Sequence, residues 1–198
     1  CEIAFKLAAY NLGTVSILHA YDLPYSDRSM TTSLLEVMKD NAEKNMEAFS
    51  KKVKAKYSGA FKTIVNLGNP IRLIHDHSEQ DDIDLVVMGT HGSSGIDSFE
   101  KFILGSNAYR IVRMAQCPVI TVRHAKDEVS FKKIVLPLDT TKETKDKVAS
   151  AVKIARVFGA TIHLVGVTSR FEELRLGADK LQGQLEDVAW SIQDAGVP

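Results

Sequence analysis

A buried strand that runs into a glycine-rich segment and then into a helix constrains this chain more than any other feature. Residues 85–88 are all apolar, and Gly89, Gly92 and Gly95 follow them at short intervals. The pair Gly105-Ser106 then opens a helical pattern. Glycine lets the main chain approach a ligand closely, and the free N–H groups of a helix N-terminus attract anions. The segment therefore predicts a backbone site for phosphate.

These residues resemble the nucleotide-binding members of the universal stress protein family. Their motif, G-x2-G-x9-G-[ST], lies between the fourth strand and the fourth helix, and its literal spacing is met by Gly92, Gly95, Gly105 and Ser106. The pair Cys117-Pro118 matches one that often leads the family's fifth strand. The resemblance implies a binding protein for ATP or a related adenine nucleotide, with or without Mg²⁺.

A second register of the motif is open. In the family's usual G-[TS]-H-G alignment the first two glycines are Gly89 and Gly92, and twelve residues then precede Gly105. In that register the loop is longer than the family's usual one, which bears on phosphate geometry more than on fold.

The resemblance also assigns the site residues. It implies that adenine lies near Ala20 and Met88 and that the hydroxyl of Ser106 donates to a phosphate. It also implies that Gly95 relieves backbone strain in the loop. Asp139 follows a strand at the place where family members use an aspartate near the ribose and adenine. The backbone groups implied for ribose and phosphates belong to Gly89, Gly92, Gly105, Ser106 and Asn107.

The same residues also suit roles that need no nucleotide. The glycines fit a tight strand-to-helix turn, and His91 fits either a phosphate or a local hydrogen bond. No G-x4-G-K-[ST] loop and no evident carboxylate pair support hydrolysis, so we expect a binding protein and not an enzyme, with a slow ATP-hydrolysing relative as an alternative. A further alternative is a nucleotide-independent scaffold for dimerisation or interaction.

A comparison of the chain with itself at a shift of 147 residues aligns Ala4 with Ala151 and continues without a gap through Thr14 and Thr161. Both copies predict a helix end, a glycine turn and a strand. We therefore predict a tandem repeat with incomplete copies: a first domain over residues 1–123, a linker over 124–130, and the N-terminal part of a second domain over 131–198. The first strand of the first copy is expected before Cys1; alternatively, the strand at 133–139 completes the first domain.

Strand and helix patterns alternate along the chain. Strands are predicted at 14–20, 61–67, 85–88, 119–122 and 133–139, and helices at 1–12, along a stripe from Leu35 to Tyr57, from Asn69-Pro70 onward, and at 106–115. This alternation predicts a doubly wound α/β fold with a parallel sheet. The resemblance adds a five-stranded sheet of order 3-2-1-4-5, of the adenine nucleotide alpha hydrolase type.

Composition excludes several classes of protein. Of 198 residues, 25 are basic and 25 acidic, and the lysines at 51–56 suit the end of a helix, so neither nucleic acid nor a membrane is an expected partner. No apolar run is long enough to span a bilayer, which makes a cytoplasmic protein the expectation. Two cysteines are too few for a disulfide framework, and Cys117 is interpreted as a small buried residue.

Partner surfaces and isolated residues complete the predictions. Members of the resembled family pair through the fifth strand, which implies a homodimer or an intramolecular domain pair through residues 119–122.

His75 and His77 are two apart, a spacing that helical zinc sites avoid, so we interpret them as solvated surface residues. Trp190 lies near Leu185 and Val188 and is interpreted as a packing residue.

Overall fold

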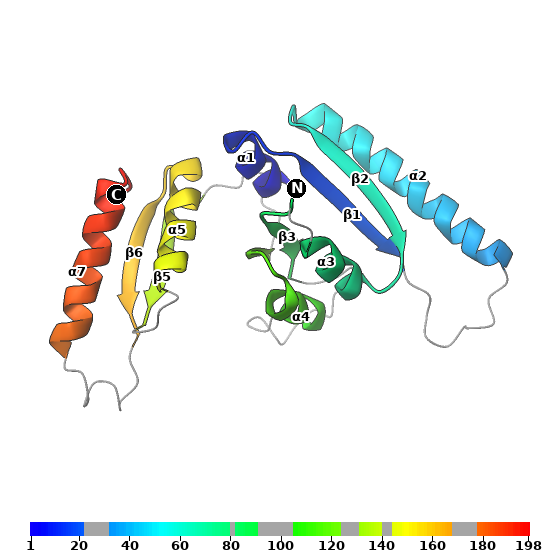
Figure 1. Cartoon of the computed structure of the whole chain (residues 1–198). Helices are drawn as coiled ribbons and strands as arrows, with labels where there is room; N and C mark the ends of the chain where they lie inside the picture. Colours follow the sequence, from blue (N-terminus) through cyan, green and yellow to red (C-terminus); the bar gives the residue numbers. More distant parts are fainter. Residues whose placement is uncertain (22–31, 80–81, 91–104, 124–130, 140–143, 168–177) are drawn as a thin grey trace. The chain divides into compact units, whose positions relative to one another are not determined.

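The computed structural model describes residues 1–21, 32–79, 82–90, 105–123, 131–139, 144–167 and 178–198. The chain divides into two compact units, Cys1–Asp127 and Glu128–Pro198, whose helices and strands are labelled in Figure 1. Each unit is described by itself. The predicted linker, residues 124–130, lies outside the described residues.

The first unit alternates helices and strands. Its elements in chain order are α1 (Glu2–Tyr10), β1 (Val15–Tyr21), α2 (Thr32–Lys56), β2 (Phe61–Leu67), α3 (Pro70–Ser78), β3 (Val86–Gly89), α4 (Ser106–Met114) and β4 (Val119–Val122). Every predicted element of this unit is present, with ends shifted by three residues at most. The alternation and the parallel pairing of its strands confirm the α/β class.

The strands pair in twos. β1 runs parallel to β2 from Val15 opposite Phe61 to Tyr21 opposite Leu67, and β3 runs parallel to β4 with Val86 opposite Val119. The two pairs form separate sheets, whereas we expected one five-stranded sheet. The order 3-2-1-4-5 would place a further strand between β1 and β3, and it stays a prediction.

Helix α2 packs along β1 and β2 through one apolar stripe (Figure 1). Ala42, Met46 and Val53 are buried on this stripe, so Met46 is a core residue. At the end of α2, Tyr57 stacks on Phe5 of α1 with ring centroids 4.6 Å apart, and Phe61 meets Phe5 edge to face at 5.8 Å. Among the described helices, α2 included, none is both long and apolar enough to cross a membrane.

Helix α3 begins where the sequence predicts it. The side chain of Asn69 accepts hydrogen bonds from the backbone N–H groups of Ile71 (3.0 Å) and Arg72 (3.3 Å), and Pro70 occupies the first turn. An asparagine cap followed by proline satisfies the free donors of a helix start. Ile71 is buried, and α3 packs against β1 and α4.

The second unit has its own core. Its elements are β5 (Lys133–Leu138), α5 (Thr144–Phe158), β6 (Thr161–Gly166) and α7 (Ala178–Asp194), and β5 runs parallel to β6. Both helices contact the sheet, and the buried residues are Leu136, Leu138, Ala151, Ala155, Ala160, Ile192 and Val197.

Our interpretation of Trp190 as a packing residue is wrong. Its side chain is 70% exposed, while Leu185, Val188 and Ile192 turn toward the core from the same helix. Trp190 lies two residues from both Val188 and Ile192, and each residue advances a helix by about 100°. A position midway between two core residues of adjacent turns therefore faces away from the core.

Candidate functional site

The predicted adenine-binding residues lie near the carboxyl ends of two parallel strands. Ala20 is the penultimate residue of β1, and Met88 is the penultimate residue of β3, where it pairs with Thr121. Both side chains are half-buried, and Gly89, which ends β3, is exposed. Ligands of open α/β sheets bind outside the carboxyl ends of the strands. Both residues therefore lie on the ligand-binding side of the strand pair to which each belongs.

The two ends of the glycine loop are held together. The N–H of Thr90 donates to the carbonyl of Val122 at 3.0 Å, which anchors the start of the loop to β4. The N–H of Gly105 donates to the carbonyl of Thr90 at 3.1 Å, which closes the loop. The predicted residues His91, Gly92 and Gly95 lie outside the described residues.

Helix α4 begins directly after Gly105, where the glycine loop ends. Gly105 is its N-cap, with φ −54° and ψ 148°, and no side chain in the described part of the chain caps it. The first turn carries no acidic residue, and Ser106 and Asn107 are exposed. Free N–H groups and the positive end of the helix dipole attract an anion, and the Ser106 hydroxyl adds a donor. These residues fit a phosphate group.

The opposite end of α4 is tied to α3. The Nδ1 atom of His75 lies 3.1 Å from the carbonyl oxygen of Met114 in the last turn of α4. The N–H of Gln116 donates to the hydroxyl of Ser78 at 3.5 Å, and that hydroxyl donates to the carbonyl of His75 at 2.8 Å. Ser78 is only 3% exposed and its two hydrogen bonds are partly buried, whereas the contact between His75 and Met114 is exposed.

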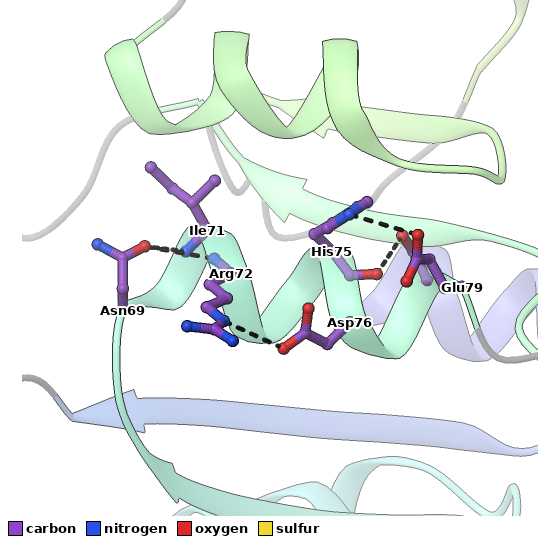
Figure 2. A network of polar contacts seen from close by, with 7 residues as sticks. Asn69, Ile71, Arg72, His75, Asp76 and Glu79 are labelled. Carbon is purple, nitrogen blue, oxygen red and sulfur yellow. Dashed lines mark hydrogen bonds and ion pairs between the residues drawn. The ribbon is translucent and has the colours of Figure 1, made fainter.

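Our interpretation of His75 as a solvated surface residue is incomplete, because its side chain is 25% exposed and also makes contacts within the protein. Besides its contact with Met114, its Nε2 atom lies 3.5 Å from the carboxylate of Glu79 (Figure 2). The neighbouring Asp76 pairs instead with Arg72 at 3.7 Å, on another side of α3. A partner 39 residues away leaves no pattern in the sequence, which is why the contact could not be predicted.

Asp139 belongs to the second unit. It follows β5 at the carboxyl end of that strand, and its Oδ2 atom lies 3.4 Å from Nζ of Lys147 in α5. Gly105, Ser106 and Asn107 belong to the first unit. The position of Asp139 fits the edge at which a ligand of the second unit would bind, and its predicted role stays a prediction.

Comparison with known proteins identifies the family. The profile of the Universal stress protein family matches residues 1–123. Universal stress protein MJ0531 of Methanocaldococcus jannaschii is 32% identical over 93 residues, which cover 47% of this chain and 52% of that protein. Universal stress protein YxiE of Bacillus subtilis is 33% identical over 61 residues, 31% of this chain and 39% of that protein. The chain thus spans at most about half the length of these curated relatives.

Solved structures agree in fold. Universal stress protein UspA from Lactobacillus plantarum has a TM-score of 0.50 and 24% identity, with 61% of this chain and 84% of that chain covered. A universal stress protein from Archaeoglobus fulgidus has a TM-score of 0.62 and 18% identity, with 92% and 67% covered. The match of the family profile extends over more than half of the sequence and contains the glycine loop, so the chain belongs to the universal stress protein family.

Proposed function

We propose that this chain is a cytoplasmic stress-response protein that binds ATP or a related adenine nucleotide through the glycine loop of its first unit. The observation that carries the proposal is the N-terminus of α4, which no side chain of the described residues caps and which the Gly105–Thr90 hydrogen bond holds against the end of β3. Phosphate is the ligand group that such a terminus suits best.

Different residues of the first unit would bind the phosphates and the adenine of the nucleotide. The backbone N–H groups of Ser106 and Asn107 bind phosphate oxygens, and the absence of a side chain at Gly105 leaves room for that approach. Ala20 and Met88 supply half-buried apolar surface for adenine. Binding without turnover would make the protein a regulatory binder, whose output depends on nucleotide occupancy.

The test is to denature the purified protein and identify released nucleotide by chromatography, then to titrate ATP calorimetrically with and without Mg²⁺. Gly105→Trp should abolish both signals, because a bulky side chain would fill the approach to the helix end. Gly183→Trp is the matched control, since no atom lies within 4 Å of a Cβ at that glycine. The proposal fails if wild type neither releases nor binds nucleotide, or if Gly105→Trp binds it normally.

The outer edge of β4 supports a second candidate, a nucleotide-independent scaffold. In the described part of the chain β4 pairs only with β3, and all four of its residues are half-buried. An unpaired strand edge suits pairing with another strand, in a homodimer or between the two predicted domains. Thr121→Pro should reduce association in sedimentation experiments, whereas Gly105→Trp should leave it unchanged; dependence of association on added ATP would count against this candidate.

A further inference from the structure

The exposed face of α7 carries side chains that lie outside the core of the second unit. At the centre of this face lies Trp190, whose side chain is 70% exposed. On a helix, residues three and four apart are neighbours, so Trp190 is bordered by Glu186, Asp187, Gln193 and Asp194, all of them exposed. We call Trp190 and its three acidic neighbours the Trp190 face. It combines a large aromatic ring with three carboxylates.

The carboxylates of this face differ from several others in the molecule. On other helices, some exposed acidic residues have cations one turn away: Glu47 lies 2.8 Å from Lys51, and Asp76 lies 3.7 Å from Arg72. The Trp190 face has no such ion pair in the part of the chain that the structure describes. Glu186 accepts only a neutral hydrogen bond, from Gln182 at 2.8 Å.

One feature of the face opposes stability, the exposure of its large aromatic ring. Asp194 lies in the last turn of α7, near the negative end of the helix dipole, and the guanidinium of Arg156 in α5 donates to the carbonyl oxygen of the neighbouring Ala195, which supplies a positive charge at this helix end. The indole of Trp190 is exposed to water although Leu185, Val188 and Ile192 already supply the contacts with the core. Local choices that conflict with stability concentrate at functional surfaces.

The chemistry of the face selects its partner. An aromatic ring attracts a cation over its plane, and arginine does this best because its flat guanidinium stacks on the ring while its N–H groups donate to carboxylates. The chain contains a small example, in which the guanidinium of Arg113 lies 5.7 Å from the ring centroid of Tyr109. Gly183, two turns before Trp190, has open space around it and adds no obstructing side chain.

We infer that the Trp190 face binds an arginine-bearing segment of a partner protein. The guanidinium stacks on the indole of Trp190, and its N–H groups donate to the carboxylates of Glu186, Asp187 or Asp194. The interaction is distinct from nucleotide binding, because it uses a helix face in the second unit and no residue of the glycine loop.

The experiment exploits the fact that Trp190 is the only tryptophan in the chain. The full chain is titrated with the peptide Ser-Arg-Leu-Arg-Ser and with a peptide in which citrulline, flat but neutral, replaces arginine. A lysine peptide gives the third comparison. We expect a saturable change of Trp190 emission with the arginine peptide, and binding at least about tenfold weaker with citrulline, in line with the roughly 1.4 kcal/mol that a tenfold change represents. Lysine should bind more weakly than arginine.

Variants test the residues, with binding followed by the anisotropy of a labelled peptide. Trp190→Ala and the triple variant Glu186→Gln, Asp187→Asn, Asp194→Asn should each weaken binding at least as much as citrulline does. The matched control is Glu36→Gln with Asp40→Asn, two exposed acidic residues of α2, which should bind like wild type. Circular dichroism checks that each variant folds. If one does not, the comparison of the arginine and citrulline peptides on the wild-type chain still tests the inference.

Three results would overturn the inference. The first is no response to the arginine peptide at millimolar concentration. The second is equal binding of the citrulline or lysine peptide. The third is a Trp190 emission that changes with protein concentration alone, together with a dimer in sedimentation, which would assign the face to a second copy of this chain.

Discussion

Leu12 and Gly159 hold the same left-handed backbone conformation, with φ of 55° and 61°. In both turns the next residue donates its N–H to the carbonyl five residues back, at 2.8 Å for Gly13 and 2.9 Å for Ala160. Leu12 and Gly159 are separated by 147 residues, the shift found in the sequence, so the equivalence supports the proposed duplication. The turn thus requires a left-handed residue at position 12, one residue before Gly13.

Leu12→Gly should stabilise the first unit. A non-glycine residue in the left-handed region costs about 1–2 kcal/mol, and the extra chain entropy of glycine offsets roughly 0.5–1 kcal/mol of the gain. Leu12 is 96% exposed, so no packing is lost. We expect the free energy of unfolding to rise by about 0.5–1 kcal/mol, measured by denaturant titration.

Two variants control this prediction. Gly159→Ala should destabilise the second unit by roughly 1 kcal/mol, because alanine has to adopt φ 61° there. Gly13→Ala should be close to neutral, since a Cβ at Gly13 would meet Ala8 only at an ordinary 3.8 Å. A Leu12→Gly protein no more stable than wild type, beside a destabilised Gly159→Ala, would show that the turns are not equivalent.

Gly166→Ala should destabilise the second unit. A Cβ at Gly166 would lie 2.8 Å from Cδ2 of Leu181 and 3.1 Å from Cδ1 of Leu185. Overpacking typically costs about 1–3 kcal/mol, and we expect the lower end because both atoms are the ends of flexible side chains. The opposite change is expected for Gly183→Ala in the middle of α7, where alanine gains roughly 0.5–1 kcal/mol over glycine. Thermal unfolding should separate the two variants, and equal melting temperatures would contradict the packing described for β6 and α7.

Asn69→Ala should weaken the start of α3. Loss of the bonds from Ile71 and Arg72 costs about 0.5–2 kcal/mol at a typical N-cap. Asn69→Asp should retain the cap, because its carboxylate accepts the same hydrogen bonds and suits the helix dipole. Denaturant midpoints for the two variants measure the difference, and an alanine variant as stable as the aspartate variant would refute the cap.

Cys117 should react slowly with alkylating agents near neutral pH. Its thiol is half-buried, and burial raises the pKa of Cys117 above its usual value, so less reactive thiolate is present in the folded protein. Alkylation by iodoacetamide, followed by mass spectrometry, should accelerate as pH rises and should be faster at pH 8 in denaturant than in the folded chain. Because the folded thiol ionises less readily, stability should be unaffected below the pKa of the unfolded thiol and fall above it. Equal rates in the folded and denatured chain at pH 8 would contradict the prediction.

Much of the fold was predictable because its signals are local. The period of apolar residues indicated α2, the pair Asn69-Pro70 marked the start of α3, and β-branched runs indicated β1 and β4. At the candidate site the start of α4 was predictable, since Gly105 is its N-cap, and the binding roles of the site residues stay predictions. The role of Trp190 was predicted wrongly because it depends on which helix face packs, and the contacts of His75 were missed because they depend on a distant partner.

The sequence by itself determined approximately where the helices and strands of the first unit lie, and it placed glycine at the junction of β3 and α4. Helix caps, turn residues and the periodicity of apolar residues depend on a few neighbouring residues, so they can be recognised in the sequence. Only the tertiary structure decided that Gly105 closes on Thr90, that His75 ties α3 to α4, and that Trp190 faces away from the core. Those relationships depend on elements brought together by packing, and no local pattern of residues encodes which side chains will meet.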